Sequence, residues 1–362
     1  MFEKRDARAR GWARRLDEWL ERRRKYKTLL LPDDDEGIAK AKKLLDNGEI
    51  CAVATETVYG LAASAFHERA VNRIFIAKGR PQNNPLIVHV TNIRMIYPLV
   101  IEVPKKLTAL ADAFWPGPLT VVMKKSGLTP DCVTGGLDTI AIRMPSHPSM
   151  RRLIDACGYP IAAPSANSSG APSPTTAQHV LNDLNGKIPL ILDGGNCGVG
   201  VESTVVSLAG EKPVLLRPGA VTLEQLESVL GSVDIAKGVN ERPEPDSVPL
   251  SPGMSYKHYS PKAKVTLLVG AADAYVQYIR QHGSFDFAVC FDSEGREAGL
   301  PFESLGDTQS SEQAQRRVFA ALREADIRGA THIAARCPAT DGEWLALFNR
   351  LQRSAGFEVV TL

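Results

Sequence analysis

The sequence predicts a two-domain α/β protein, with a first domain built on a mixed sheet and a smaller Rossmann-like unit after it. Helix-like and strand-like segments alternate from residue 33, and some strands are adjacent, as in a mixed sheet. Residues 232–263 break this alternation with proline, serine and charge, which is typical of a linker. We therefore expect domains at 28–231 and 264–362, with a basic extension at 1–27.

The elements of the first domain follow from hydrophobic spacing and stop signals. Apolar residues recur on one face of a helix expected at 36–47, and Gly48 would end it. The strand at 50–54 then leads into a loop at 55–60. Further helices are expected at 68–78, 103–114, from about 148, 175–184 and 222–230, and further strands at 85–90, 119–124, 139–144, 160–163, 190–193, 202–208 and 213–217.

The second unit repeats the alternation on a smaller scale. Strands are expected at 265–269, 287–291 and 332–335, and helices at 271–282, 310–325 and 342–354. This order predicts a compact three-layer α/β domain. The glycine-rich motif of dinucleotide-binding domains does not occur between its first strand and its first helix, so a dinucleotide site is not expected. A supporting, docking or regulatory unit is the interpretation that remains.

The composition is that of an ordinary globular protein, with 44% hydrophobic and 23% charged residues over 362 positions. No apolar run approaches the ~20 residues of a membrane helix. The charged N-terminus lacks the apolar region of a secretory signal. Six scattered cysteines without a CxxC pair favour reduced thiols in a cytoplasmic protein. We expect no zinc site and no membrane partner.

Positive charge is concentrated at the N-terminus, where residues 1–27 hold 11 Lys or Arg against five Asp or Glu. Trp12, Leu16 and Trp19 fall on one face of an expected helix. Such a segment could be an arm that faces RNA or a partner. It could equally be an amphipathic helix packed on the domain or a poorly ordered extension, and the sequence leaves these alternatives open.

Residues 78–90, KGRPQNNPLIVHV, are the first candidate for a functional site. Lys78 and Arg80 end an expected helix, side-chain amides follow in the turn, and His89 lies on the next strand. Two cations and fixed donors at a helix–strand turn are what a polyanion requires. The alternative is a solvated helix end whose cations complement the helix dipole.

Two other stretches leave alternatives open. The glycine cluster at 193–200 lacks the spacing of a nucleotide-binding loop and is more typical of a turn between strands, although it could shape a pocket floor. Aromatic and basic side chains crowd the end of the linker, at Met254, Tyr256, Lys257, His258 and Tyr259. This segment either contacts a ligand as a lid or docks on the neighbouring domain.

Eight ordered segments carry a resemblance to a known family. These are TETVYGL (55–61), KGRPQNNPLIVHV (78–90), FWPGPLTVV (114–122), IAIRMPSHP (140–148), APSANSSG (163–170), ESTVV (202–206), LRPG (216–219) and SPGMSYKHYSP (251–261). In this order the chain resembles the Sua5 branch of the Sua5/YciO/YrdC family, the threonylcarbamoyl-AMP synthases, over roughly residues 28–362. The resemblance implies an open twisted YrdC-like sheet with a large concave cavity, then a Rossmann-like C-terminal domain.

The activity that the resemblance implies is nucleotidyl transfer. L-Threonine, bicarbonate and ATP, with Mg²⁺, would give threonylcarbamoyl-AMP and pyrophosphate. A separate transferase complex would then pass the threonylcarbamoyl group to adenosine 37 of tRNAs that read codons beginning with A, the t6A modification. A weak contact of the protein itself with tRNA stays open.

The resemblance also implies site residues. The KxR and SxN signature of the family falls on Lys78, Arg80, Ser165 and Asn167, which would be catalytic. The threonine side would comprise Thr57, His89, Arg143, Ala163 and Ser203. The ATP side would comprise Arg80, Asn84, Thr139, Ser165, Ser173, Arg217 and Tyr256. No residue is expected to ligate a metal directly.

Two other functions share part of this pattern. An RNA-binding or ribosome-maturation module would use the same basic side chains on phosphates, with an affinity that falls steeply with salt. A carbamoyl-adenylate enzyme acting on another acceptor is the third alternative. Threonine- and bicarbonate-dependent consumption of ATP separates the synthase from both.

Overall fold

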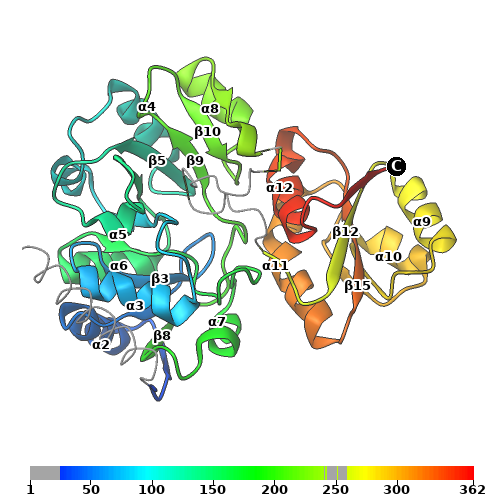
Figure 1. Ribbon diagram of the computed structural model, residues 1–362, viewed down its shortest axis with the longest axis horizontal. Helices are drawn as coiled ribbons and strands as arrows, with labels where there is room; N and C mark the ends of the chain where they lie inside the picture. Colours follow the sequence, from blue (N-terminus) through cyan, green and yellow to red (C-terminus); the bar gives the residue numbers. More distant parts are fainter. Residues whose placement is uncertain (1–24, 240, 243–250, 252–258) are drawn as a thin grey trace, which may run out of the picture.

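The computed structural model describes residues 25–239, 241–242, 251 and 259–362. The expected N-terminal helix and Tyr256 lie outside these residues. The described chain forms two sheets, one in each expected domain (Figure 1). None of the helices described combines the length and apolar character that crossing a bilayer requires.

The first sheet is mixed and has 11 strands in the order β1-β8-β2-β3-β7-β4-β6-β5-β9-β10-β11. β4 and β6 are parallel, whereas β5 and β6 are antiparallel, so the centre of the sheet contains both kinds of strand pairing. The strands are β1 (Leu29–Pro32), β2 (Cys51–Val53), β3 (Gly60–Ser64), β4 (Ile87–His89), β5 (Leu119–Lys124), β6 (Thr139–Arg143), β7 (Ile161–Ala162), β8 (Leu190–Asp193), β9 (Thr204–Ser207), β10 (Val214–Arg217) and β11 (Asp234–Ile235).

Helices cover this sheet where the spacing predicted them. They are α2 (Asp35–Asp46), α3 (Glu68–Lys78), α4 (Lys105–Phe114), α5 (Asp131–Thr134), α6 (Pro148–Cys157), α7 (Ala177–Leu184) and α8 (Leu223–Leu230). The short α5 is an addition that was not expected from the sequence. Local chemistry fixes their ends: Asp34 caps α2 by accepting from the amide of Gly37. Gly79 ends α3 in the left-handed conformation, at φ 65°, so the chain turns sharply between Lys78 and Arg80.

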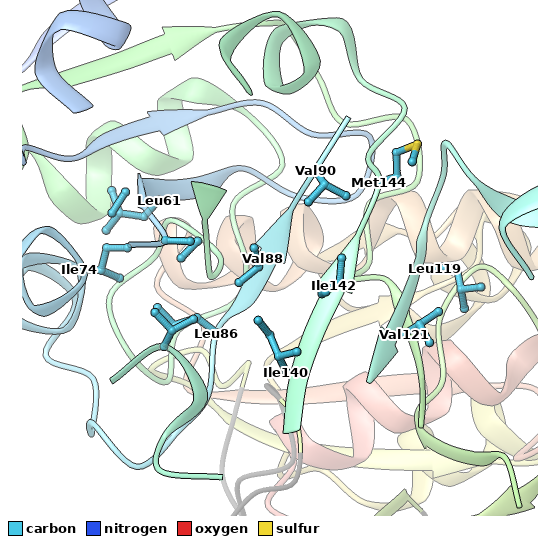
Figure 2. Close-up of a cluster of buried hydrophobic side chains, with 14 of the residues drawn as sticks. Leu61, Ile74, Leu86, Val88, Val90, Leu119, Val121, Ile140, Ile142 and Met144 are labelled. Atoms are coloured by element: carbon cyan, nitrogen blue, oxygen red, sulfur yellow. The ribbon is translucent and has the colours of Figure 1, made fainter. Parts of the chain in front are cut away.

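The main core lies between these helices and one face of the sheet. Val88, Val121 and Ile142, from three neighbouring strands, are fully buried in it (Figure 2). Ile74 joins them from α3. Because residues alternate between the two faces of a strand, His89 and Arg143 point to the opposite face from Val88 and Ile142. The same strands therefore supply both the core and a polar concave face.

The second sheet is parallel, in the order β14-β13-β15-β12-β16. Its strands are β12 (Lys264–Val269), β13 (Phe287–Cys290), β14 (Phe302–Ser304), β15 (His332–Cys337) and β16 (Val359–Thr361), with helices α9 (Ala272–Gln281), α10 (Asp292–Ala298), α11 (Ser311–Ile327) and α12 (Leu345–Ser354). Helices α11 and α12 lie between this sheet and the first domain, and α9 and α10 cover the outer face (Figure 1). The compact α/β unit expected from the sequence is confirmed, with β15 lying between β13 and β12 in its sheet.

Several elements were not expected from the sequence. Strand β3 occupies residues assigned to the end of a loop and to the gap after it, and α10, β14 and β16 complete the second unit. The expected linker does not begin as an unpacked segment, because β11 pairs with β10 through Asp234 and Ile235. Val239 after it is also buried. The first residues of this segment are therefore part of the first sheet.

Candidate active site

A cavity opens on the face of the first sheet to which His89 and Arg143 point. Strands β4 and β6 end together there, because His89 and Arg143 are register partners on parallel strands. The loops before β3 and after β7, and the facing ends of β9 and β10, complete the wall. The lining residues are Thr55, Thr57, Val58, Gly60, Arg80, Ile87, His89, Arg143, Ala163, Pro164, Ser165, Glu202, Ser203, Arg217 and Tyr259.

Three buried arginines dominate the charge of this cavity. Arg80, Arg143 and Arg217 are 8%, 3% and 3% exposed, and all three line it. Burial is the main cause that lowers the pKa of Arg80 to about 10, with Tyr259 opposing the shift and the charge of Arg217 contributing to it. The guanidinium therefore still carries its charge at neutral pH. Three buried cations that line one cavity form a site for an anion.

Arg80 is fixed by the turn that follows it. Its Nη2 donates to the carbonyl oxygen of Pro85 at 3.0 Å. Its Nε is buried and has no hydrogen-bond partner among the described residues. A buried donor without a partner costs about 1–3 kcal/mol, and an oxyanion bound in the cavity would supply the missing acceptor.

Lys78 lies behind the cavity and does not line it. Its Nζ donates to the carbonyl oxygen of Asn167 at 2.6 Å, to Asn167 Oδ1 at 3.2 Å and to the carbonyl oxygen of Ser165. Burial, and then the charge of Arg80, lowers its pKa well below the usual value. These three bonds use the three donors of an ammonium group. Lys78 thus fixes the backbone of the SxN loop from which Ser165 faces the cavity.

Arg143 is oriented by groups on the loop between β2 and β3. Its Nη1 donates to Thr57 Oγ1 at 2.8 Å, and its Nη2 lies 2.7 Å from Glu56 Oε1. Nε donates to the carbonyl oxygen of Gly117 at 3.3 Å. Burial would raise the pKa of Glu56, but Arg143 and the backbone amides of Ser146 and Glu56 together outweigh it, and the net shift of the pKa is downward. The carboxylate therefore stays charged and, with Thr57, fixes the guanidinium of Arg143 in the wall of the cavity.

Ser203 and Arg217 face each other across β9 and β10. Arg217 donates from Nε and Nη2 to the carbonyl oxygen of Ser203, at 3.0 and 2.9 Å, and from Nη2 to its hydroxyl at 3.1 Å. The hydroxyl of Thr120 lies 2.8 Å from that of Ser203. A register irregularity between Leu215 and Arg217 turns the arginine toward this pair.

His89 is a neutral group in this cavity. Burial, and then the charge of Arg143, lowers the pKa of its imidazole from 6.5 to about 3. A histidine with this pKa stays unprotonated at neutral pH and is a weak base. Its place beside Arg143 suits a group that orients a ligand, and not one that removes a proton.

Comparison with known proteins decides the family. The family model described as telomere recombination, for the Sua5, YciO and YrdC proteins, matches residues 43–219, and the model for the threonylcarbamoyl-AMP synthase C-terminal domain matches residues 221–356. The threonylcarbamoyl-AMP synthase of Pyrococcus abyssi is 43% identical over 329 residues, which cover 88% of this chain and 94% of that protein. The chain belongs to the Sua5 branch of this family.

Two further relatives agree with this assignment. The threonylcarbamoyl-AMP synthase of Bacillus subtilis is 43% identical over 336 residues, 91% of this chain and 96% of that protein. The crystal structure of P. abyssi Sua5 complexed with L-threonine superposes with a TM-score of 0.84 at 40% identity, covering 92% of this chain and 99% of that one. The similarity thus includes both domains of the Sua5 architecture.

Most residues that the resemblance assigned converge on the cavity. Those that line it are Thr57, Arg80, His89, Arg143, Ala163, Ser165, Ser203 and Arg217. Lys78 and Asn167 lie behind it in the SxN loop, Ser173 donates to Glu202, and Asn84 lies against Arg80. Thr139 begins β6, at the opposite end from Arg143, and Tyr256 lies outside the described residues.

The sequence did not single out Glu202 or Tyr259 as site residues, although it placed both near candidate segments. Glu202 accepts from Ser173 Oγ and, at 2.7 Å, from Nε of Arg350 in the second domain. Tyr259 is fully buried, has a positive φ of 62° and ends the linker in the cavity wall. Tyr259 was part of the aromatic cluster in the linker, which was the available signal. No sequence signal pointed to Arg350.

Proposed function

We propose that this protein is an L-threonylcarbamoyladenylate synthase, an enzyme that condenses L-threonine, bicarbonate and ATP to threonylcarbamoyl-AMP and pyrophosphate. The observation that carries the proposal is the convergence of Arg80, Arg143 and Arg217 with hydroxyl groups on one buried cavity, in a chain of the Sua5 branch. Three buried cations around one cavity can offset the charge of two anionic reactants, which is what the reaction requires.

The chemistry suits these residues. Threonine and bicarbonate give a carbamate and water. A carbamate oxygen then attacks the α-phosphorus of ATP, forming the new P–O bond as the bond to the β-phosphate oxygen breaks and pyrophosphate leaves. The carbamate is already an anion, so the step needs no strong general base. Such transfers depend on alignment and on charge stabilisation, which the buried arginines supply.

The threonine side is proposed at the ends of β4, β6 and β9. Arg143, aimed by Glu56, would hold the carboxylate of threonine, and Thr57 and Ser203 would bond its polar groups. Neutral His89 would orient the substrate, and Ala163 would leave room beside it. A site that pairs a substrate hydroxyl rejects analogues lacking it more strongly than an apolar pocket does.

The nucleotide side is proposed around Arg80, Ser165 and Arg217, with Lys78 holding the SxN loop. Ile87 and Ala141 belong to a small apolar cluster on the cavity side and lead toward Thr139, along which the nucleoside would extend. Asn84, Ser173 and, beyond the described residues, Tyr256 are the remaining proposed contacts. Mg²⁺ would enter with the triphosphate, since among the described residues no cluster of His, Cys, Asp or Glu could hold a metal ion.

The product defines what must follow. Threonylcarbamoyl-AMP is a labile mixed anhydride, so a transferase complex must consume it. We propose that it serves the t6A modification at adenosine 37 of tRNAs that read codons beginning with A.

Pyrophosphate release from Mg·ATP tests the proposal, measured with and without L-threonine and bicarbonate, with L-serine as the control amino acid. We expect release to require both co-substrates and to collapse in Lys78→Ala and Arg80→Ala. The surface variant Arg152→Ala should retain it, since this residue pairs with Asp35 on the exterior. Absence of threonine-dependent release from folded protein that binds ATP would refute the synthase and return the RNA-binding alternative.

A further inference from the structure

Arg350 of α12 is a fully buried arginine that reaches from the second domain into the wall of the cavity. Its Nε donates to Glu202 Oε2 at 2.7 Å, and its Nη2 donates to the carbonyl oxygens of Glu202 at 3.2 Å and Pro218 at 3.0 Å. Its Nη1 donates to Asn349 Oδ1 at 3.0 Å. The guanidinium carbon lies 5.4 Å from the ring centroid of Tyr259. All three guanidinium nitrogens are therefore engaged.

The partners of Arg350 are the neighbours of the residues that face the ligand. Glu202 immediately precedes Ser203, and Pro218 immediately follows Arg217. A single guanidinium thus ties together the two chain segments that present this pair. Glu202 and Tyr259 themselves line the cavity.

The apolar contacts between the domains follow the same pattern. Val58, which lines the cavity, and Val201, which precedes Glu202, belong to the hydrophobic cluster of the second domain, with Leu347 and Leu351 of α12. Helix α12 lies on the side of the second domain that faces the first (Figure 1). Its apolar residues therefore pack against the back of the cavity wall, while Arg350 reaches Glu202 in the wall itself.

We propose that Arg350 is a positioning residue for the synthase reaction, which fixes Ser203, Arg217 and Tyr259 in the geometry that binds the reactants. The inference rests on the proposed function and adds a residue of the second domain to the site. Arg350 does not line the cavity, so it acts through Glu202 and through the two carbonyl oxygens. A displacement of about 1 Å in such a wall can lower a rate on the order of 10²-fold.

The chain offers a matched control in Arg336 of β15. This arginine is 3% exposed, pairs with Glu294 at 2.9 Å and stands 5.6 Å from the ring of Tyr275, yet it does not line the cavity. Arg336→Met and Arg350→Met each remove a buried arginine of the second domain from an ion pair, within that domain for Arg336–Glu294 and across the two domains for Arg350–Glu202. Only the second disturbs the cavity wall.

The test compares Arg350→Met, Arg350→Lys and Arg336→Met with the wild-type chain, at a temperature where circular dichroism shows each to be folded. Threonine-dependent pyrophosphate release gives kcat and KM for L-threonine and ATP. For Arg350→Met we expect kcat/KM to fall on the order of 10²-fold, with raised KM. Arg350→Lys should be intermediate, because it keeps the charge and loses the fork. Arg336→Met should keep both KM values.

The KM values separate a positioning role of Arg350 from a purely structural one. A purely structural role would reduce kcat with the folded fraction and leave KM unchanged, so unchanged KM in folded Arg350→Met would overturn the inference. If Arg350→Met does not fold, Arg350→Lys decides by the same criterion. If the wild-type chain releases no threonine-dependent pyrophosphate, the proposed function fails. In that case, calorimetric titration with ATP and with L-threonine tests the positioning role without the reaction. Equal affinities in the wild-type chain and the Arg350 variants would overturn that role.

Discussion

The guanidinium of Arg80 combines a retained charge with an unused donor, and each can be tested separately. Arg80→Lys keeps the charge but loses the planar fork and the bond to Pro85. We expect kcat/KM for threonine-dependent pyrophosphate release to fall about 10-fold in Arg80→Lys and on the order of 10²-fold in Arg80→Ala. If the lysine variant matched the wild-type chain, charge alone would suffice and the geometric role of Nε would be wrong.

His89 predicts a pH dependence of stability. Its pKa is about 3 in the folded chain and 6.5 ordinarily, so between these values the unfolded chain binds more protons. Stability therefore rises with pH across this window and falls on acidification, by roughly 2 kcal/mol between pH 7 and pH 5. His147 and His179 have lowered pKa values and add to the same trend, so the difference between variants isolates His89.

Urea unfolding of His89→Gln at pH 5 and pH 7 is the measurement. The variant should lose less stability on acidification than the wild-type chain, and His282→Gln, at an exposed position, should behave like the wild type. Identical pH dependence in wild type and His89→Gln would show that His89 is not buried as a neutral group.

At the scale of elements, the glycine cluster between β8 and β9 is shaped to fit α11. Gly200 has a φ of 85°, and a Cβ there would lie 2.3 Å from Cα of Arg316. Arg316 in turn donates from Nε to the carbonyl oxygen of Gly198 at 2.7 Å. The sequence favoured a simple turn here. The turn is present, and it is also a contact with the second domain.

Gly200→Ala should therefore destabilise the protein, by about 1–3 kcal/mol from overpacking alone and by more once the strained φ is included. Gly198→Ala is the matched control, because its added Cβ meets no atom within 4 Å. It should change stability by no more than about 0.5 kcal/mol. Urea unfolding of both variants checks this, and equal effects would refute the close fit to α11.

The elements that the sequence predicted share long, periodic patterns, and those it missed do not. Helix α3 was expected at its observed bounds, Glu68–Lys78, because its apolar residues recur at helical spacing. Strand β3 reads Gly-Leu-Ala-Ala-Ser, which carries no β-branched residue and resembles a loop. It forms because its residues are fully enclosed between β2 and β7. Such tertiary stabilisation leaves no local signal.

For the molecule as a whole, arginines of the second domain reach back to the first. Arg323 of α11 binds both carboxylate oxygens of Asp183, at 2.9 and 2.8 Å, and a backbone oxygen of Pro172. The partners are 140 positions apart in sequence. The eight sequence motifs predicted most of the cavity, because the residues that line it lie within these motifs. Contacts such as this one and that of Arg350 could not be predicted, since only the packing of two domains brings their partners together.

These contacts predict that both sheets unfold together. Val58 and Val201 of the first domain belong to the hydrophobic cluster of the second domain, and the Arg323–Asp183 pair has side chains only 10% and 12% exposed. Both features make the domains mutually dependent. Calorimetry should show one transition with equal van't Hoff and calorimetric enthalpies.

Arg323→Met leaves the Asp183 carboxylate without its arginine, so we expect the free energy of unfolding to fall by about 3 kcal/mol and the transition to separate into two. Arg328→Met, which removes an exposed pair with Glu303, should change stability by less than about 1 kcal/mol and keep one transition. Two separate transitions in the wild-type chain would show that the domains are energetically independent, and that the contacts between them stabilise only their immediate surroundings.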